Sequence, residues 1–217
     1  YGLIAVIFSW GLGKKIYITV IGTGSVQPLY RRFKKNLLIW AYRHAYKIVA
    51  VSSNTKREIL KIVPGLDIEI VNHGVDYGKF QITNSESQTN PEIQNLKPYI
   101  LSVGTLKKRK GYEYSVKAFA EVSEKFPELK YVIVGKGPER ENLKSQISNL
   151  KLERKIVFFD RVEEDFLIKL YHNAELFILL PQDDGKDIEG FGLVFLEAAA
   201  SGLPVLSSLG SGAEDAV

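Results

Sequence analysis

The sequence predicts an α/β protein whose strands form parallel sheets. Short runs of apolar and β-branched residues, such as residues 99–103 and 130–134, are apolar almost throughout, as strands covered on both faces of a sheet are. These runs alternate with segments of helical periodicity about 10–14 residues long. The length of 217 residues, 45% hydrophobic and 25% charged, suits one large or two small globular domains.

The first part of the chain predicts three strands and two helices. Strands are expected at residues 16–21, 47–51 and 67–71, where a short β-branched run is followed by Gly, Ser or Asn. Ser52 or Ser53 can cap a helix that includes residues 56–62. Residues 29–46 predict an amphipathic helix with a basic outer face. Its apolar positions recur at intervals of three and four, at Leu29, Phe33, Leu37, Trp40, Ala41 and Ala45.

A polar stretch separates this part from a second alternation of strands and helices. Residues 81–97 lack periodicity and predict an exposed linker, so the expected organisation is one domain at 1–76, a linker at 77–97 and a second domain at 98–217. In the second domain, strands are expected at residues 99–103, 130–134, 155–159, 176–180 and 204–207. Helices are expected at residues 112–125, 139–150, 163–172 and 191–201.

Composition and charge exclude some functions and leave others open. There is no cysteine, and the three histidines have no metal-ligand spacing, so neither a disulfide nor a histidine metal site is expected. The apolar run at residues 3–10 is too short to cross a bilayer. Residues 1–80 contain 12 Lys and Arg against 4 Asp and Glu. This excess fits an anionic membrane surface, an anionic substrate or a solvated helix face. Nucleic acid is not expected as a partner, because the basic helix lacks interleaved aromatics and no binding motif is present.

Ligands of open parallel sheets bind at the carboxyl ends of the strands, so the loops there hold the candidate site residues. After residues 99–103, Gly104 is followed by a basic run at residues 107–110, which predicts a phosphate site. After residues 130–134, Gly135 and Gly137 either admit a ligand close to the backbone or only satisfy the sterics of the turn.

An acidic loop and a helix follow residues 176–180. Asp183, Asp184, Asp187 and Glu189 are interpreted as solvated or as acceptors for sugar hydroxyls, because their spacing fits no calcium loop. Glu197 falls on a helix face that is otherwise nearly apolar, so its carboxylate needs a partner, which is a protein donor or a ligand hydroxyl. No arrangement of nucleophile and base is present. The pattern therefore favours a phosphorylated, polyhydroxylated ligand such as a nucleotide sugar.

The stretch from Glu189 to Val205 resembles the motif of retaining GT-B glycosyltransferases in which seven residues separate two glutamates. The group it resembles is glycosyltransferase family 4, with its glycosyl transferases group 1 domain. Further landmarks occur in the family's order, at Val51-Ser52, Asn72, Gly74-Val75-Asp76, Val103-Gly104, Lys110-Gly111, Val134-Gly135, Gly137-Pro138 and Gly210-Ser211-Gly212. The resemblance implies two Rossmann-like domains, both incomplete, in an internal portion of a longer enzyme. Residues 1–76 would belong to the acceptor domain and residues 98–217 to the donor domain.

The resemblance also implies roles for individual residues. Glu189 would contact hydroxyls of the donor sugar and Lys110 would neutralise the diphosphate leaving group, so these two are the predicted catalytic residues. Glu197 would accept hydrogen bonds from the ribose, and Val162 would border the base. The other donor-binding candidates are Gly104, Thr105, Gly135, Gly137, Gly190, Phe191, Gly192 and Leu193. The candidates on the acceptor side are Gly22 and Thr23.

The activity implied is retaining transfer of a sugar from a nucleoside-diphosphate sugar to a glycan or lipid-linked acceptor, in polysaccharide or glycolipid synthesis, without metal or cofactor. The protein would be cytoplasmic, and the basic helix at residues 29–46 would contact the inner face of an anionic membrane. Three residues depart from the family: Thr105 replaces an arginine, Ile21 a histidine and Asp160 a glycine. These departures leave an alternative open, a GT-B-like protein that binds nucleotide or glycan without catalysis.

Overall fold

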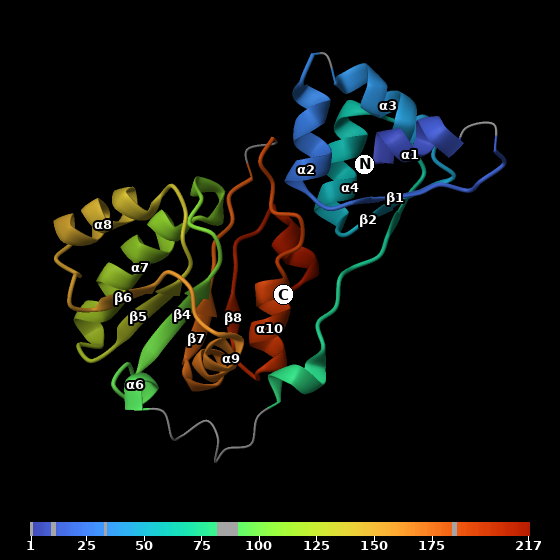
Figure 1. The fold of residues 1–217 in the computed structure, drawn as a ribbon. Coiled ribbons are helices and arrows are strands. Elements are labelled where there is room, and N and C mark those ends of the chain that lie inside the picture. Colours follow the sequence, from blue (N-terminus) through green and yellow to red (C-terminus); the bar gives the residue numbers. More distant parts are fainter. Residues whose placement is uncertain (1, 10–11, 33, 82–90, 184–185) are drawn as a thin grey trace. The chain divides into compact units, whose positions relative to one another are not determined.

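The computed structural model describes residues 2–9, 12–32, 34–81, 91–183 and 186–217, which form two compact units (Figure 1). Unit 1 consists of residues up to His73 together with Asp183–Gly192 and Leu209–Ala216. Unit 2 consists of Gly74–Gln182, Leu193–Ser208 and Val217. Each unit has its own parallel sheet, which confirms the predicted α/β class.

Unit 1 is built on a three-stranded parallel sheet. Its strands lie in the order β1 (Tyr17–Val20), β2 (Lys47–Ala50) and β3 (Ile68–Ile70). The register places Tyr17 opposite Lys47 and Val20 opposite Ala50. The core gathers apolar side chains from all three strands, which include Ile18, Val20, Ile48 and Ile68.

Helices connect these strands. β1 leads through α2 (Thr23–Val26), η1 (Gln27–Tyr30) and α3 (Lys35–His44) to β2, and α4 (Ser53–Ile62) leads from β2 to β3. Ser52 caps α4, because its hydroxyl accepts from the backbone N–H of Thr55. Near the chain's start, α1 (Gly2–Ser9) contacts α3. Within the described ranges, no helix has both the length and the apolar character that crossing a membrane requires.

The helix predicted at residues 29–46 is wrong in its extent. Residues 27–30 form the 3-10 helix η1, Arg31 has an extended backbone, and α3 begins only at Lys35. The basic residues Arg31, Arg32 and Lys34 are exposed, but they precede the helix instead of lining its outer face. A membrane contact would therefore use the loop before α3 and its first turn.

The inner face of α3 agrees with the prediction only in part. Leu37, predicted to face inward, is 48% exposed. Trp40, Ala41 and Ala45 pack in or against the core as predicted, and Leu38 and Tyr42, which were not predicted there, join them. Phe33, which was predicted on the same apolar face, lies outside the described residues.

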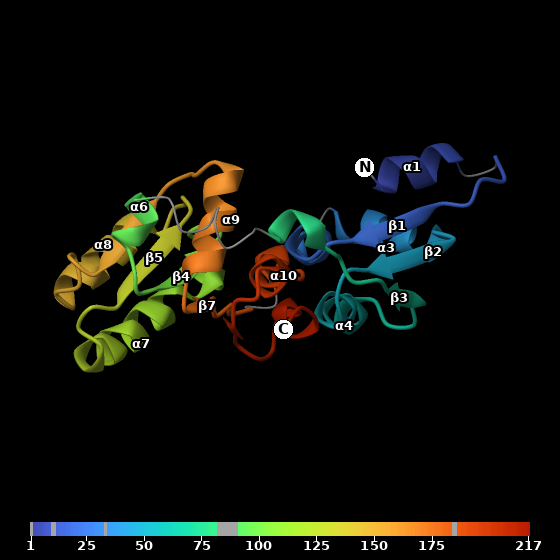
Figure 2. The ribbon, with the colours of Figure 1, turned by 90° about the horizontal axis from the view of Figure 1, so that it is seen from below.

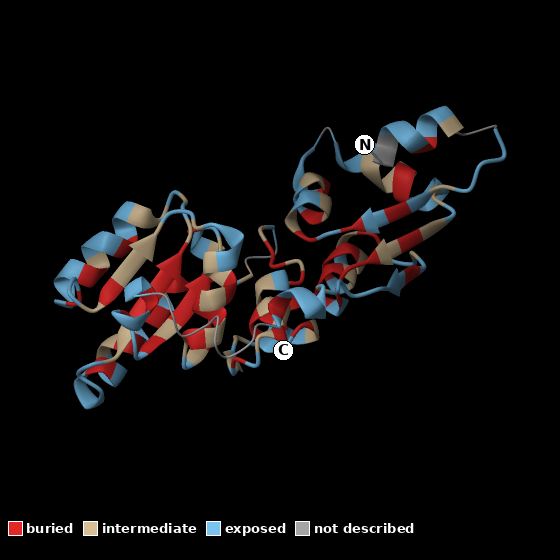
Figure 3. Ribbon diagram, turned by 60° about the horizontal axis from the view of Figure 1, so that its bottom comes forward, coloured by how far each residue is buried: buried red, intermediate tan, exposed pale blue. Residues whose placement is uncertain are grey.

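Unit 2 is built on a five-stranded parallel sheet. The strand order is β6-β5-β4-β7-β8, at Ile156–Phe159, Lys130–Val134, Tyr99–Val103, Leu176–Ile178 and Val205–Leu206. The helices that connect the strands are α7 (Tyr112–Lys125), α8 (Arg140–Asn149), α9 (Glu164–Asn173) and α10 (Leu193–Ala200). Figure 2 shows α7 and α9 on opposite faces of this sheet. Because both faces are covered, buried residues gather along β4, β5 and β7 (Figure 3).

The strand order of unit 2 reverses between β4 and β7. From β4 the chain moves outward to β5 and β6, and then returns to β7 on the other side of β4. In open parallel sheets, ligands bind at the carboxyl ends of the strands at such a switch point. A ligand of this unit is therefore expected at the loops that follow Val103 and Ile178.

The described part of the predicted linker packs into unit 2. Residues Tyr77–Phe80 form η2, and residues Pro91–Gln94 form α6, in which Ile93 is fully buried. Gln81 donates from Nε2 to the carbonyl of Ala200, 2.6 Å away. Among the described residues of this stretch, Phe80, Ile93 and Leu96 are buried and the others are exposed, and residues 82–90 lie outside the described part of the chain.

Candidate functional site

The loop that carries Glu189 folds against the end of β1 within unit 1. Glu189 is buried, with 6% of its surface exposed. A Cβ built on Gly22 would lie 2.6 Å from the Cα of Gly190, and one built on Gly212 would lie 2.3 Å from the carbonyl oxygen of Glu189. Glycine at these positions lets three backbone segments touch. The predicted acceptor-side Gly22 and the predicted catalytic loop are thus brought together.

The Thr23 hydroxyl links the segment after β1 to the loop before Glu189 by hydrogen bonds. Thr23 Oγ1 lies 2.7 Å from Asp187 Oδ1 and 2.9 Å from the carbonyl of Ile188, and it accepts from the backbone N–H of Ile188 at 2.9 Å. The hydroxyl predicted to face an acceptor therefore holds the loop before Glu189. Its effect on a ligand would be exerted through the position of that loop.

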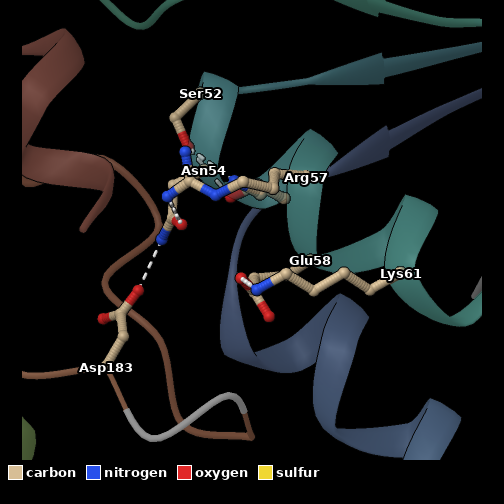
Figure 4. Close-up of polar contacts among 7 residues, drawn as sticks. Ser52, Asn54, Arg57, Glu58, Lys61 and Asp183 are labelled. Carbon is tan, nitrogen blue, oxygen red and sulfur yellow. Dashed lines mark hydrogen bonds and ion pairs between the residues drawn. The ribbon is translucent and has the colours of Figure 1, made fainter. Parts of the chain in front are cut away.

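Two acidic residues of this loop, Asp183 and Asp187, are half-buried and form hydrogen bonds within the protein. Asp183 accepts from the backbone N–H of Glu189 at 2.7 Å and from Nδ2 of Asn54. Figure 4 shows Asn54 extending from α4 toward Asp183. Asp187 is bonded to Thr23, as described above. Neither carboxylate is fully exposed, their role as acceptors for sugar hydroxyls stays a prediction, and Asp184 lies outside the described residues.

Asp215 is a residue of this site that the sequence did not single out. Its Oδ2 accepts from the backbone N–H of Ser53, at the start of α4, at 2.8 Å, and from Asn72 Nδ2 at 3.1 Å. A carboxylate at a helix N-terminus satisfies donors that the helix itself leaves open. The sequence signal that points to such a residue is the helix start at Ser52-Ser53, because the free backbone N–H groups of a helix N-terminus need acceptors.

Unit 1 also contains a buried aromatic contact and a cavity beside β1. The Phe191 ring is buried and packs edge-to-face on His73, with centroids 5.9 Å apart. A cavity of about 550 Å³ opens beside β1, and its lining includes Ile21, Lys34, Leu38 and Tyr42. Its walls are mainly apolar, and Lys34 supplies a positive charge.

In unit 2, Lys110 lies at the switch point between β4 and β7. It ends the 3-10 helix η3 (Lys108–Lys110), and only 7% of its surface is exposed. A Cβ built on Gly104 would lie 3.9 Å from Lys110 Nζ, so the structure brings these two predicted site residues together. The backbone N–H of Gln182 donates to the carbonyl of Arg109 at 2.7 Å, which joins the loops after the two strands.

Gly135 and Gly137 are explained by the packing of the backbone. A Cβ built on Gly135 would lie 1.9 Å from the carbonyl oxygen of Gly104, and one built on Gly137 would lie 2.4 Å from that of Leu106. The steric interpretation of this glycine pair therefore accounts for both residues, because a side chain at either would collide with the loop after β4.

The remaining donor-side candidates are spread along the same unit. Thr105 is exposed, Val162 is half-buried between β6 and α9, and Leu193 is 42% exposed at the start of α10. Asp160, where the family has a glycine, forms an ion pair with Arg140. The guanidinium of Arg140 also lies over the Phe158 ring, 4.9 Å from its centroid.

Glu197 is half-buried on α10 and has a neutral partner. Its Oε2 accepts a hydrogen bond from the Tyr171 hydroxyl of α9 at 2.8 Å. Burial raises the pKa of Tyr171 well above its ordinary value, and the charge of Glu197 raises it further, so the hydroxyl keeps its proton and donates. Tyr171 is thus a protein donor of the kind that the Glu197 carboxylate was expected to need, and the sequence did not identify it.

The predicted residues therefore fall into two groups. Gly22, Thr23, Glu189, Gly190, Phe191 and Gly192 belong to unit 1. Gly104, Thr105, Lys110, Gly135, Gly137, Val162, Leu193 and Glu197 belong to unit 2. The two predicted catalytic residues, Glu189 and Lys110, are in different units.

The sequence matches a known family over most of its length. The sequence model described as glycosyl transferases group 1 matches residues 84–217. An uncharacterised glycosyltransferase of Methanocaldococcus jannaschii is 31% identical over 195 residues, which cover 85% of this chain and 48% of that protein. A GDP-mannose-dependent α-(1-6)-phosphatidylinositol monomannoside mannosyltransferase of Mycolicibacterium smegmatis is 29% identical over 158 residues, with coverages of 71% and 41%. The chain spans less than half the length of these relatives.

Solved structures share the fold. HepE of Anabaena, in complex with UDP, superimposes with a TM-score of 0.82 at 19% identity, covering 100% of this chain and 59% of that one. A sucrose-phosphate synthase of Thermosynechococcus elongatus gives a TM-score of 0.75 at 20% identity, with coverages of 97% and 55%. These similarities and the two parallel sheets identify the fold as GT-B.

Proposed function

Because the chain belongs to the glycosyl transferases group 1 family, we propose that it forms part of an enzyme that transfers a sugar from a nucleoside-diphosphate sugar. The acceptor proposed is a glycan or a lipid-linked molecule, in the synthesis of a polysaccharide or glycolipid. The names of similar proteins support this class of donor and product, since they include a GDP-mannose-dependent mannosyltransferase and a glycogen synthase. HepE was solved with UDP and with UDP-glucose.

The observation that carries the proposal is the placement of Glu197, the second glutamate of the family motif. Glu189 is buried in a loop fixed by glycine contacts and by Thr23, and Glu197 is half-buried beside a neutral hydroxyl. Removing carboxylates from water is costly. The half-buried position of Glu197 is understandable if ribose hydroxyls complete the hydrogen bonding of its carboxylate.

The proposed chemistry depends on charge stabilisation. Lys110, buried at the switch point of unit 2, would stabilise the diphosphate as the bond to the sugar breaks. The leaving diphosphate would take the proton of the acceptor on the same face of the sugar, which retains the configuration without a protein base or a metal. The apolar cavity of unit 1, with Lys34 in its lining, supports an acceptor that has a lipid part or a negative charge.

A donor-binding experiment on the full-length protein tests the proposal. Thermal unfolding is measured with UDP-glucose and with GDP-mannose, and a bound donor should stabilise the protein by about 2.7 kcal/mol at one hundred times its dissociation constant. Glu197→Gln should lose most of this stabilisation while the unliganded protein unfolds at an unchanged temperature. Glu121→Gln, the same change at an exposed position of α7, is the matched control.

The outcomes separate the candidate functions. Sugar transfer to any acceptor, or hydrolysis of the bound donor, supports the enzyme. Donor binding without turnover favours the alternative of a nucleotide-binding protein without catalysis, for which exposed Thr105 in place of the family's arginine is the supporting observation. No stabilisation by either donor would argue against both.

A further inference from the structure

The Tyr171 hydroxyl is aimed at Glu197 by the packing of its ring. Tyr171 is fully buried on α9, in a row of aromatic side chains. Its ring centroid lies 6.2 Å from that of Phe80 and 5.9 Å from that of Phe177, and Phe177 in turn packs edge-to-face on Phe195 of α10. These contacts leave the ring little freedom, so the position of its oxygen is set by the core.

In the part of the chain that the structure describes, the Glu197 carboxylate has one hydrogen-bonded oxygen, Oε2. Oε2 accepts the Tyr171 hydrogen bond at 2.8 Å, and among the described residues no other hydrogen bond to this carboxylate is found. A glutamate has three side-chain torsions, and ordering them when a ligand binds costs free energy. A hydrogen bond present before binding removes part of that cost. It also fixes the direction in which Oε1 accepts.

The cations nearby do not replace this interaction. Lys79 of η2 is paired with Glu164, 2.6 Å away, and this pair is the main cause of the raised pKa of the lysine, to which the charge of Glu197 adds; Lys79 and Glu164 are both largely solvent-exposed. Exposed ion pairs are weak and screened. The buried hydroxyl is therefore the group that orients the carboxylate.

We propose that Tyr171 is a positioning residue for the donor: it fixes Glu197 so that the carboxylate accepts from the two ribose hydroxyls of the nucleotide. This inference rests on the proposed function, because it assumes a nucleoside diphosphate in unit 2. It adds a prediction that the family assignment alone does not make. Removing one buried oxygen should weaken recognition of the ribose specifically, and not binding of the base or the diphosphate.

The test compares ribose discrimination between variants. Isothermal titration calorimetry of the full-length protein gives dissociation constants for UDP, for GDP and for the 2′,3′-dideoxy form of each. For the nucleotide that binds more tightly, the discrimination ratio is the dissociation constant of the dideoxy form divided by that of the ribose form. For the unaltered protein this ratio should be roughly tenfold to hundredfold, as expected for hydrogen bonds to a charged group.

Tyr171→Phe keeps the ring and removes the hydroxyl. Its ratio should fall by about threefold to tenfold, the effect expected when a side chain must be ordered during binding. In a Glu197→Gln background, Tyr171→Phe should change the ratio no further. Tyr131→Phe removes a hydroxyl that is equally buried in unit 2 but bonded to Ser102 and Ser115, so its ratio should equal that of the unaltered protein.

Two results would overturn the inference, and they are distinguishable. An unchanged ratio in Tyr171→Phe would overturn it while leaving the proposed function in place. Failure of the unaltered protein to bind either diphosphate would overturn the proposed function and this inference with it. Partial unfolding does not obscure the result, because it lowers the number of sites measured and leaves the ratio within each variant unaffected.

Discussion

Tyr131 shows how a single buried side chain connects several elements of unit 2. Its hydroxyl on β5 lies 2.6 Å from Ser102 Oγ of β4 and donates to Ser115 Oγ of α7 at 2.8 Å. Burial raises the pKa of Tyr131 to about 12, and the two serine hydrogen bonds act in the opposite direction. The neutral hydroxyl is thus the form that the folded protein accommodates.

The pKa of Tyr131 predicts a loss of stability in alkali. Because the folded pKa of about 12 exceeds the ordinary value of 10.0, the stabilisation is complete below pH 10 and is lost as the pH rises toward 12. Tyr131→Phe should be less stable by about 1–2 kcal/mol at pH 8, since two buried serines lose a partner. It should also lose less stability than the unaltered protein between pH 10 and pH 11. Urea unfolding at the three pH values measures both effects, and equal losses above pH 10 would contradict the assignment.

The sequence predicted at the residue scale which groups need partners, but it did not identify the partners. The apolar neighbours of Glu197 indicated a carboxylate in need of a donor, and Tyr171 supplies it from 26 positions away. Asp215 is likewise 162 positions from Ser53. Such pairs depend on tertiary packing, which periodicity and local motifs do not encode.

At the scale of elements, the contact of Gly22, Gly190 and Gly212 determines where the Glu189 loop can lie. Gly22 has a φ of +91° and its missing Cβ would overlap Gly190, so alanine there is disfavoured by both backbone strain and collision. Gly22→Ala should therefore destabilise the protein by about 2–4 kcal/mol, as measured by thermal or urea unfolding.

A neighbouring glycine provides the control for this prediction. Gly24, two residues later in α2, has no atom within 4 Å of an added Cβ. Gly24→Ala should be neutral or slightly stabilising, because alanine favours a helix more than glycine does. Equal stability of the Gly22→Ala and Gly24→Ala variants would show that the loop can move away at little cost.

Most elements could be predicted from the sequence, and the exceptions have a common cause. The spans of α7, β4 and β5 agree with the prediction because buried runs and amphipathic periodicity are strong local signals. The helix predicted at residues 29–46 failed because apolar residues at intervals of three and four also suit a 3-10 turn followed by a shorter helix. η2 and α6 were missed because they are too short to show periodicity.

At the scale of the whole molecule, the charge is distributed unevenly along the chain. Residues 1–80 carry 12 Lys and Arg against 4 Asp and Glu, and residues 81–217 carry 17 against 21. Arg31, Arg32, Lys34 and Lys35 are all exposed and adjacent in sequence. Because each basic residue near an anionic surface contributes about 1 kcal/mol, changing all four to Glu should reduce binding to vesicles that contain phosphatidylserine by at least about tenfold.

A second charge reversal tests whether position matters. Lys117, Lys125, Lys151 and Arg154 are exposed residues of unit 2, and changing them to Glu alters the net charge by the same amount. Vesicle sedimentation at low and physiological salt should show a smaller effect for this control. Equal binding by the two variants would mean that the loop before α3 has no special role at a membrane.

Unit 1 includes two segments from late in the sequence, Asp183–Gly192 and Leu209–Ala216. This division determines how a chimera between this protein and a relative should be built. A chimera that replaces everything after the polar stretch would pair a foreign Gly190 and Gly212 with the native Gly22, across contacts in which no additional atom fits. The exchange should instead replace Gly74–Gln182 and Leu193–Ser208 and keep the two intervening segments native. Such an exchange would leave unchanged the backbone contacts that hold the Glu189 loop.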